Sequence, residues 1–239
     1  MRALRLFLLV TLVPACRSAG PERAPNALSE EERRAGWELL FDGRDTQGWR
    51  GYRQAACPAG WQAIDGALTR AGEGGDIVSE DEYQDFELAF EWRVAPGANS
   101  GLMFHVGEQR EYPWETGPEF QILDNGAHPD GREPKTSAGS NYAMHAPRAD
   151  VTHAPGEWNQ ARLIVLGPHV EHWLNGEKLL EYELWSDDWK SRVAACKWKD
   201  RPDYGTLKRG RIALQDHGDW VAFRNMRLKR LRPEGVGTK

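Results

Sequence analysis

The sequence predicts an all-β protein, an antiparallel β-sandwich with long loops that form a site. Apolar and polar residues alternate over "FELAFEWRV" (86–94), so one side of this extended segment is apolar and the other is polar. Asn175-Gly176 joins two further extended segments and suits the positive φ angles of a tight hairpin turn. Because no long helical periodicity separates the extended segments, a sandwich is favoured over a fold with alternating strands and helices.

The first residues have the pattern of an export signal. Two arginines precede an apolar run over residues 6–13 that is too short to span a bilayer, so we expect residues 1–15 to be a signal peptide of the lipoprotein type. "VPAC" (13–16) resembles a bacterial lipobox, in which the thiol of Cys16 is acylated; an ordinary signal cut a few residues later is the alternative. With the lipobox, the protein is expected in the bacterial cell envelope, anchored in the membrane by its N-terminal lipid on the periplasmic face of the outer membrane.

Composition divides the rest of the chain into a tether, one domain and a tail. Residues 16–35 are rich in Ala, Pro, Glu and Arg and are expected to be a tether, in which "LSEEERRAG" (28–36) predicts a short helix capped by Ser29. Residues 36–232 are expected to form the sandwich domain, and residues 233–239 a tail.

Strands are expected wherever residues alternate in the same way. The turns at Gly167-Pro168 and Asn175-Gly176 predict an antiparallel meander over residues 161–184. The expected strands are 86–94, 100–106, 119–123, 161–166, 169–174, 177–184, 210–217 and 220–231.

Two long segments lack strand patterns. Residues 124–157 are rich in Gly, Pro, Asn, Asp and His, and residues 185–209 contain three tryptophans and several lysines. Loops of this length are uncommon in compact domains unless they build a site.

Charge and cysteine content exclude some classes of protein. Lys and Arg total 31 against 36 for Asp and Glu, and without a basic stripe nucleic acid is not an expected partner. The chain has no HExxH, GxSxG or P-loop pattern. Cys57 and Cys196 either form a disulfide or stay as two unpaired thiols.

Two predicted strands carry polar residues that suit a catalytic site. Glu119 and Gln121 share one face of "EFQIL" (119–123), and Gln215 and His217 share one face of "GRIALQDH" (210–217). Each segment therefore presents an amide beside a group that can exchange a proton, and the two would converge if they lie on the same sheet face. The alternatives are a solvated strand carboxylate for Glu119 and a turn over "DHGD" in which His217 serves only the backbone.

These residues point to carbohydrate as the ligand. Amides and carboxylates bind sugar hydroxyls, and aromatic rings stack on the C–H faces of sugars. The chain has 11 Trp; we assign Trp114 to substrate binding and expect Trp92 and Trp173 to fill the core.

Two further candidates have weaker support. By alternation His105 shares a face with Met103 in "SGLMFHV" (100–106), which makes it a candidate for substrate binding. The loop "DNGAHPDG" (124–131) is rich in oxygen ligands, so Asp124 is a candidate ligand for a divalent cation such as Ca²⁺. An ordinary turn is the alternative for this loop, and no other cofactor is indicated.

Five segments together resemble the 3-keto-disaccharide hydrolase family of bacterial proteins. They occur in the family's order and span nearly the whole mature chain: "WELLFDGRDTQGWRGY" (37–52), "ANSGLMFHV" (98–106), "PEFQILDN" (118–125), "PGEWNQARLIVLGPHVEHWLNGEKLLEYEL" (155–184) and "GRIALQDHGDWVAFRNMRLKRL" (210–231). The resemblance implies a concanavalin-like jelly roll and cleavage of glycosides that carry a ketone at C3. Removal of the C2 proton, elimination of the C1 substituent and addition of water would follow.

The resemblance also implies roles for individual residues. Glu119 and His217 would transfer protons, Gln121, Gln215 and Asn99 would hold substrate, and Arg224 or a bound cation would face the enolate. "MFHV" departs from the family pattern, which has an arginine at the position of His105.

Two other functions fit the same fold. A retaining glycosidase needs two closely spaced carboxylates, and the "E-x-D-x-x-E" arrangement of laminarinase-like enzymes is missing. A non-catalytic, lectin-like carbohydrate-binding module at the cell surface is the stronger alternative, because fold does not determine function. The sequence does not indicate an oligomeric state.

Overall fold

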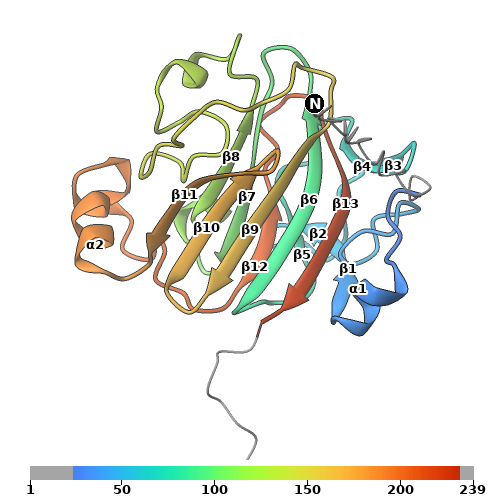
Figure 1. Ribbon diagram of the computed structural model, residues 1–239, viewed down its shortest axis with the longest axis horizontal. Helices are drawn as coiled ribbons and strands as arrows, with labels where there is room; N and C mark the ends of the chain where they lie inside the picture. Colours follow the sequence, from blue (N-terminus) through green and yellow to red (C-terminus); the bar gives the residue numbers. More distant parts are fainter. Residues whose placement is uncertain (1–23, 232–239) are drawn as a thin grey trace, which may run out of the picture.

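Alternating residues build two antiparallel sheets that pack face to face (Figure 1). The structure, a computed structural model, describes residues 24–231. In β6 (Phe86–Val94) every second side chain is buried, as expected for a strand with one face on the core. The prediction of an all-β jelly-roll sandwich is confirmed.

The larger sheet lies nearer the viewer in Figure 1 and the smaller sheet lies behind it. In spatial order the larger sheet contains β11 (Glu177–Glu183), β10 (His169–Leu174), β9 (Asn159–Leu166), β6, β13 (Val221–Arg230), β4 (Ala67–Arg70) and β3 (Trp61–Ile64), with β1 (Trp37–Leu39) also paired to β13. The smaller sheet contains β2 (Trp49–Gly51), β5 (Ile77–Ser79), β12 (Arg211–Leu214), β7 (Asn99–Val106) and β8 (Glu119–Leu123).

All eight predicted strands are present, and β6, β8 and β10 have the predicted limits. Asn175 and Gly176 have φ angles of 49° and 85° and form the expected hairpin turn between β10 and β11. The strand β12 is shorter than predicted, because the chain leaves the sheet after Leu214 and continues as a loop. That loop carries two of the predicted site residues, Gln215 and His217.

The core lies between the two sheets and is rich in aromatic side chains. Trp92 is 1% exposed, which confirms its predicted place in the core. The prediction for Trp173 is wrong, because the alternation of β10 directs Val170, His172 and Leu174 inward. Trp173 lies half-buried on the outer face, where its indole donates to Glu171 over 2.6 Å.

Several elements were not predicted. The strands β1 to β5 have three or four residues each, too few to show a period. Helix α2 (Asp187–Ala194) and the 3₁₀ turn η3 (Lys197–Asp200) lie in the segment 185–209, and two more 3₁₀ turns, η1 (Pro113–Glu115) and η2 (Pro129–Arg132), lie in loops.

Residues 24–35 pack against the sandwich instead of hanging free as a tether. The predicted helix is present as α1 (Glu30–Arg34), with Ser29 as its N-cap. Asn26 is buried and exchanges two hydrogen bonds with Asn225, at 2.6 and 2.8 Å. The expected signal peptide, Cys16 and the tail lie outside the described residues, and within them no helix is long and apolar enough to cross a membrane.

Cys57 and Cys196 are both free thiols, so the second of the two alternatives for the cysteines holds. Cys196 lies against the long loop, with its Sγ 3.5 Å from the Sδ of Met144.

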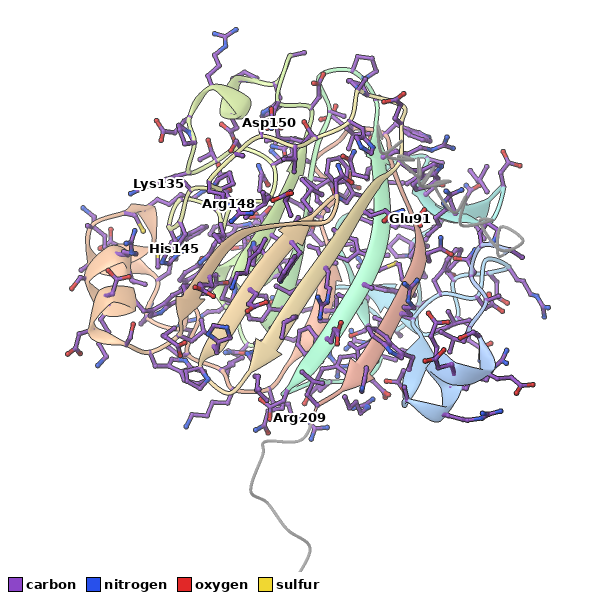
Figure 2. The ribbon with its side chains drawn as sticks, viewed as in Figure 1. Glu91, Lys135, His145, Arg148, Asp150 and Arg209 are labelled. Carbon is purple, nitrogen blue, oxygen red and sulfur yellow. The ribbon has the colours of Figure 1, made fainter. Side chains whose placement is uncertain are left out.

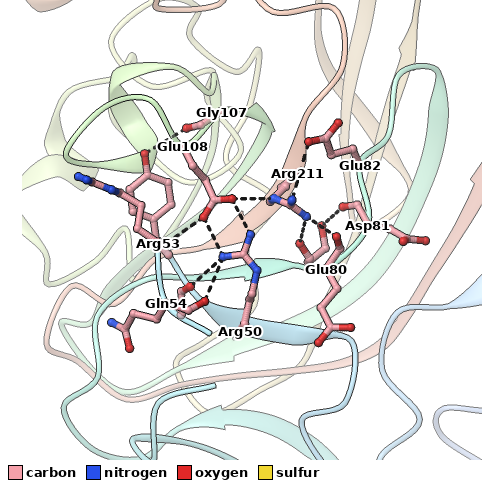
Figure 3. Close-up of polar contacts among 12 residues, drawn as sticks. Arg50, Arg53, Gln54, Glu80, Asp81, Glu82, Gly107, Glu108 and Arg211 are labelled. Atoms are coloured by element: carbon pink, nitrogen blue, oxygen red, sulfur yellow. Dashed lines mark hydrogen bonds and ion pairs between the residues drawn. The ribbon is translucent and has the colours of Figure 1, made fainter. Parts of the chain in front are cut away.

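An ion-pair network ties three strands of the smaller sheet together (Figure 3). Arg50 of β2 forms a two-pronged pair with Glu108, which lies two residues after the end of β7, at 2.8 and 2.5 Å. Arg211 of β12 reaches the same carboxylate at 3.0 Å. The Arg50 hydrogen bonds are the main reason that the pKa of Glu108 falls to about 2.

The long loop 124–157 bridges the edges of both sheets. Its residues 139–142 pair with the free edge of β8, through Tyr142 N to Glu119 O at 3.1 Å and Gly139 N to Gln121 O at 2.8 Å. Farther on, Arg148 N donates to Leu179 O of β11 over 3.0 Å. Figure 2 shows Lys135, Arg148 and Asp150 on this loop, away from Glu91 on β6. The loop therefore fixes the edge strand that carries the predicted site residues.

Candidate active site

The candidate active site is a cleft on the outer face of the smaller sheet. Phe120 and Ile122 of β8 point into the core, so Glu119 and Gln121 point outward. The cleft has a volume of about 410 Å³, within the range of small-ligand sites.

The cleft brings together six of the residues predicted from the sequence and four others. The predicted ones are Asn99, Trp114, Glu119, Gln121, Gln215 and His217. The additional ones, which sequence reasoning missed, are Tyr142, Lys197, Trp198 and Arg201. The expected convergence of the segments near residues 120 and 216 is therefore present in the structure.

Glu119 is a buried carboxyl group with few partners. It is 4% exposed and lines the cleft. In one orientation of the Gln121 amide, Nε2 donates to Asn99 Oδ1 at 3.3 Å; in the reversed orientation it lies 3.1 Å from Glu119 Oε1 and 3.0 Å from the Ser100 carbonyl oxygen. Burial raises the pKa of Glu119 to about 8, so its carboxyl is largely protonated at neutral pH and can donate a proton.

Gly101 leaves the space that the Glu119 carboxyl occupies. It lies on β7 directly opposite Gln121, and Met103 lies opposite Glu119. A Cβ atom at Gly101 would lie 1.9 Å from Glu119 Oε1 and 2.7 Å from Cδ. Any other residue at position 101 would push the carboxyl out of its present position.

The segment after β12 contains a residue that stabilises the turn, Asp216, and a residue that lines the cleft, His217. Asp216 pairs with Arg70 at 2.7 Å and accepts from Gly75 N at 2.9 Å, so it holds the turn in place. His217 is exposed, lines the cleft and has its ring centroid 6.1 Å from that of His128. Asp76 accepts from Asp216 N at 2.8 Å, and burial raises the pKa of Asp76 to about 6. The "DHGD" turn thus anchors itself through Asp216 and leaves the imidazole of His217 available.

Amides line the floor of the cleft. Asn99 is held by its backbone N–H, which donates to Asp219 over 3.0 Å, and Gln215 N donates to the Gly101 carbonyl at 2.9 Å. The side chains of Asn99, Gln121 and Gln215 can donate to and accept from sugar hydroxyls.

Aromatic rings form one wall of the cleft. Trp114 on η1 stacks on Tyr112, with centroids 5.3 Å apart and ring planes 9° from parallel. Trp198 on η3 stacks on Tyr204 at 4.4 Å and donates from its indole to the Tyr142 carbonyl at 3.2 Å. The rings therefore have fixed positions before any ligand binds.

Two cations lie beside the aromatic wall. Arg201 pairs with Glu115 at 2.7 Å and lies 5.0 Å from the Trp114 ring centroid. Lys197 Nζ lies 4.4 and 4.5 Å from the ring centroids of Tyr142 and Trp198. The segment "KWKDR" (197–201) interleaves basic and aromatic residues, and this is the sequence signal that could have identified it.

Arg224 lies away from the cleft, contrary to its predicted place facing the substrate. It belongs to β13 of the larger sheet and donates to Glu91 of the neighbouring β6 at 2.7 Å. Its guanidinium lies 4.1 Å from the Trp158 ring centroid, beside a separate hollow. The two sheets and their core separate it from Glu119.

His105 is buried in the core, so its predicted contact with substrate is also corrected. A β-bulge shifts the pairing of β7 with β12 between Met103 and Val106, and His105 adopts a φ of 51° there. The bulge breaks the alternation on which the prediction depended. The ring of His105 lies 5.2 Å from that of Phe104, and its Nε2 lies 2.8 Å from the Gln84 carbonyl oxygen.

Asp124 serves the backbone of its own loop. Its two oxygens accept from Gly97 N at 2.8 Å and Gly126 N at 2.9 Å, and the residue is 8% exposed. This is the turn that the sequence offered as the alternative to a cation site, so Asp124 does not fit the predicted role of metal ligand.

Comparison with known proteins identifies the family of this chain. Residues 36–229 match the family described as 3-keto-alpha-glucoside-1,2-lyase-like domains. A 3-keto-disaccharide hydrolase from Bacteroides thetaiotaomicron is 34% identical over 227 residues, which cover 81% of this chain and 78% of that protein. This chain belongs to the 3-keto-alpha-glucoside-1,2-lyase-like family.

Solved structures support the same assignment. A protein from Parabacteroides distasonis assigned as a glycosyl hydrolase has 38% sequence identity and a TM-score of 0.82, over 87% of this chain and all of that one. A second from the same organism has 26% identity and a TM-score of 0.66, over 82% of this chain and 99% of that one. The family resemblance inferred from the sequence motifs is confirmed.

Proposed function

We propose that this protein cleaves the glycosidic bond of 3-keto-glucosides by removal of the C2 proton, elimination of the C1 substituent and addition of water. One observation carries the proposal: a buried carboxyl group with a pKa near neutrality shares a sugar-sized cleft with an available imidazole. Membership of a family of glycoside-cleaving enzymes supports the substrate class.

The ketone at C3 explains why few catalytic groups are needed. It acidifies the C2 proton, so a base takes this proton and the C–H electron pair forms the C2–C3 double bond of an enolate. The enolate electrons then form a C1–C2 double bond as the C1–O bond breaks. Water adds to this double bond, with its oxygen at C1 and a proton at C2.

His217 is assigned as the base and Glu119 as the acid. A carboxyl group that is largely protonated at pH 7 is better suited to give a proton to the departing oxygen than to take one from carbon. The imidazole of His217 is exposed, lines the cleft and makes no hydrogen bond with any described residue.

The remaining cleft residues bind the sugar. Asn99, Gln121 and Gln215 are assigned to its hydroxyls, and Trp114 to a ring stacked on its C–H face. A divalent cation remains a proposal; Asp124 would not hold it, and the cleft offers amide oxygens and the ring of His217 instead.

The proposal is tested by incubating the purified protein with 3-keto-trehalose, with and without a chelator, and measuring released 3-keto-glucose. Release by the wild type is expected, and Glu119→Gln should lower it by about 10²-fold or more while substrate binding persists. Loss of release in chelator, restored by added Ca²⁺, would support the cation. Binding without release under either condition would point to the carbohydrate-binding module and contradict the proposal.

The lipid anchor is a separate proposal, supported by the "VPAC" pattern. Expression of wild type and Cys16→Ala in a bacterium with an outer membrane tests it. Wild type is expected in the membrane fraction and the variant in the soluble fraction. An equal distribution of the two proteins would contradict lipidation of Cys16.

A further inference from the structure

Lys197 is the cation of the cleft that lacks an anionic partner. Arg201 pairs with Glu115 at 2.7 Å, so its charge is compensated within the protein. Lys197, in contrast, makes no hydrogen bond or ion pair with any described residue, and its ammonium group lies over the Tyr142 and Trp198 rings. The cleft therefore holds one positive charge that the protein itself does not neutralise.

The position of Lys197 is fixed by its surroundings. It begins η3, whose next residue, Trp198, is 2% exposed, stacks on Tyr204 and donates to the Tyr142 carbonyl. A lysine whose ammonium group already lies over two rings loses less side-chain entropy on binding an anion than a lysine without such contacts. The ammonium group of Lys197 is thus positioned to bind a negative charge that forms in the cleft during the reaction.

The protonated, neutral carboxyl of Glu119 does not neutralise the ammonium group of Lys197. Burial raises the pKa of the Glu119 carboxyl more than the positive charge of Lys197 lowers it, so this carboxyl is largely neutral at pH 7. Partial burial also lowers the pKa of Lys197, as expected for an ammonium group without a counter-ion. An anion formed on the substrate would supply the missing partner.

We propose that Lys197 is a further catalytic residue, which donates a hydrogen bond to the C3 oxygen of the substrate and stabilises the enolate as the C2 proton leaves. This proposal rests on the proposed function, because an enolate forms only if the substrate carries the C3 ketone. The amine stays protonated and forms no covalent bond; the negative charge that moves from the C2–H bond to O3 is balanced by its ammonium. Lys197 thereby takes the role that the family resemblance implied for Arg224 or a bound cation.

The alternative is that Lys197 binds an anionic group on the departing sugar or aglycone. The two roles differ in kinetics. An enolate partner acts mainly in the transition state and changes kcat, whereas an aglycone partner acts in the ground state and changes KM.

The experiment compares Lys197→Met with Lys199→Met on a neutral 3-keto-α-glucoside, with substrates carrying hydrogen or deuterium at C2. Lys199 is an exposed residue of the same 3₁₀ turn and lines a different hollow, so it is a matched control. For Lys197→Met we expect a fall in kcat of roughly 10²-fold to 10³-fold with KM changed less than about threefold, the usual effect of removing one donor to a developing oxyanion. The C2 isotope effect on kcat should rise, because proton removal becomes slower than the other steps.

Lys197→Arg and added methylammonium serve as rescues. Lys197→Arg, which keeps a positive charge, should retain part of kcat, and methylammonium added to Lys197→Met should restore part of it. Lys199→Met should match wild type. An unchanged kcat in Lys197→Met, or a raised KM with an unchanged isotope effect, would overturn the proposal. If wild type fails to cleave the substrate, the proposed function itself fails; if only the Lys197 result fails, the proposed function stands. Circular dichroism confirms that each variant is folded.

Discussion

The buried carboxyl of Glu119 makes a quantitative prediction about stability. Its pKa rises from an ordinary value of 4.5 to about 8 on folding, because burial disfavours the charged form. Below pH 4.5 the carboxyl is protonated in both the folded and the unfolded chain, so it imposes no electrostatic cost. Between pH 4.5 and 8 the folded state binds more protons than the unfolded state, and the free energy of unfolding therefore falls as pH rises.

The size of this effect follows from the pKa shift. Each pH unit across this window costs about 1.4 kcal/mol, so wild type should lose about 4 kcal/mol of stability relative to Glu119→Gln between pH 5 and pH 9. The amide of Gln does not titrate, and other groups contribute equally to both proteins. The difference between the two proteins therefore isolates the carboxyl.

Urea unfolding followed by tryptophan fluorescence at pH 5, 7 and 9 measures this difference. The two proteins should have similar dependence on pH below about 4.5, and Glu119→Gln should become progressively more stable than wild type above it. Parallel pH dependences over the whole range would show that Glu119 titrates normally. That result would refute its assignment as the acid.

Three other changes test particular contacts. Gly101→Ala should displace the Glu119 carboxyl, lower kcat by about 10-fold to 100-fold and shift the pH profile of kcat. Gly72→Ala, where a Cβ has space, should leave activity unchanged. Equal activity of the two variants would contradict the role of Gly101 in positioning Glu119. Arg224→Met should keep kcat and KM within about twofold of wild type, because the side chain lies on the other sheet; a large loss of kcat would return it to the site. Glu108→Gln should cost about 2 kcal/mol of unfolding free energy at pH 7. This loss should vanish as pH falls from 4.5 towards 2, because the folded pKa of Glu108 is depressed. If the ion pairs contribute nothing, chemical denaturation would show the same difference between wild type and variant at both pH values.

The fold was largely predictable because its long strands keep a strict period of two. Nine residues of β6 alternate without interruption, and Asn175-Gly176 fixes the hairpin between β10 and β11. The short strands β3 and β4 were missed, although Asp65 and Gly66 between them have φ angles of 51° and 72° and form the same kind of turn. Two four-residue strands show too little alternation to be recognised, but the Asp-Gly pair was an available signal.

The site was predictable where it depends on alternation and not where it depends on tertiary packing. Glu119 and Gln121 share a face of one regular strand, so their common direction follows from the sequence. His105 was misplaced because a β-bulge interrupts its strand, and Arg224 because alternation does not show which sheet a strand joins. Lys197 reaches the cleft from a separate insertion through the packing of Trp198, which no local pattern reveals.

The central claim is that cleavage begins with loss of the C2 proton, and a substrate deuterated at C2 tests it most directly. With a C2-deuterated 3-keto-α-glucoside, we predict release of the aglycone with a primary isotope effect and a 3-keto-glucose product in which solvent hydrogen has replaced the deuterium. Release of a product that keeps its C2 deuterium, at the same rate as from the unlabelled glycoside, would mean direct displacement at C1 and would contradict the account.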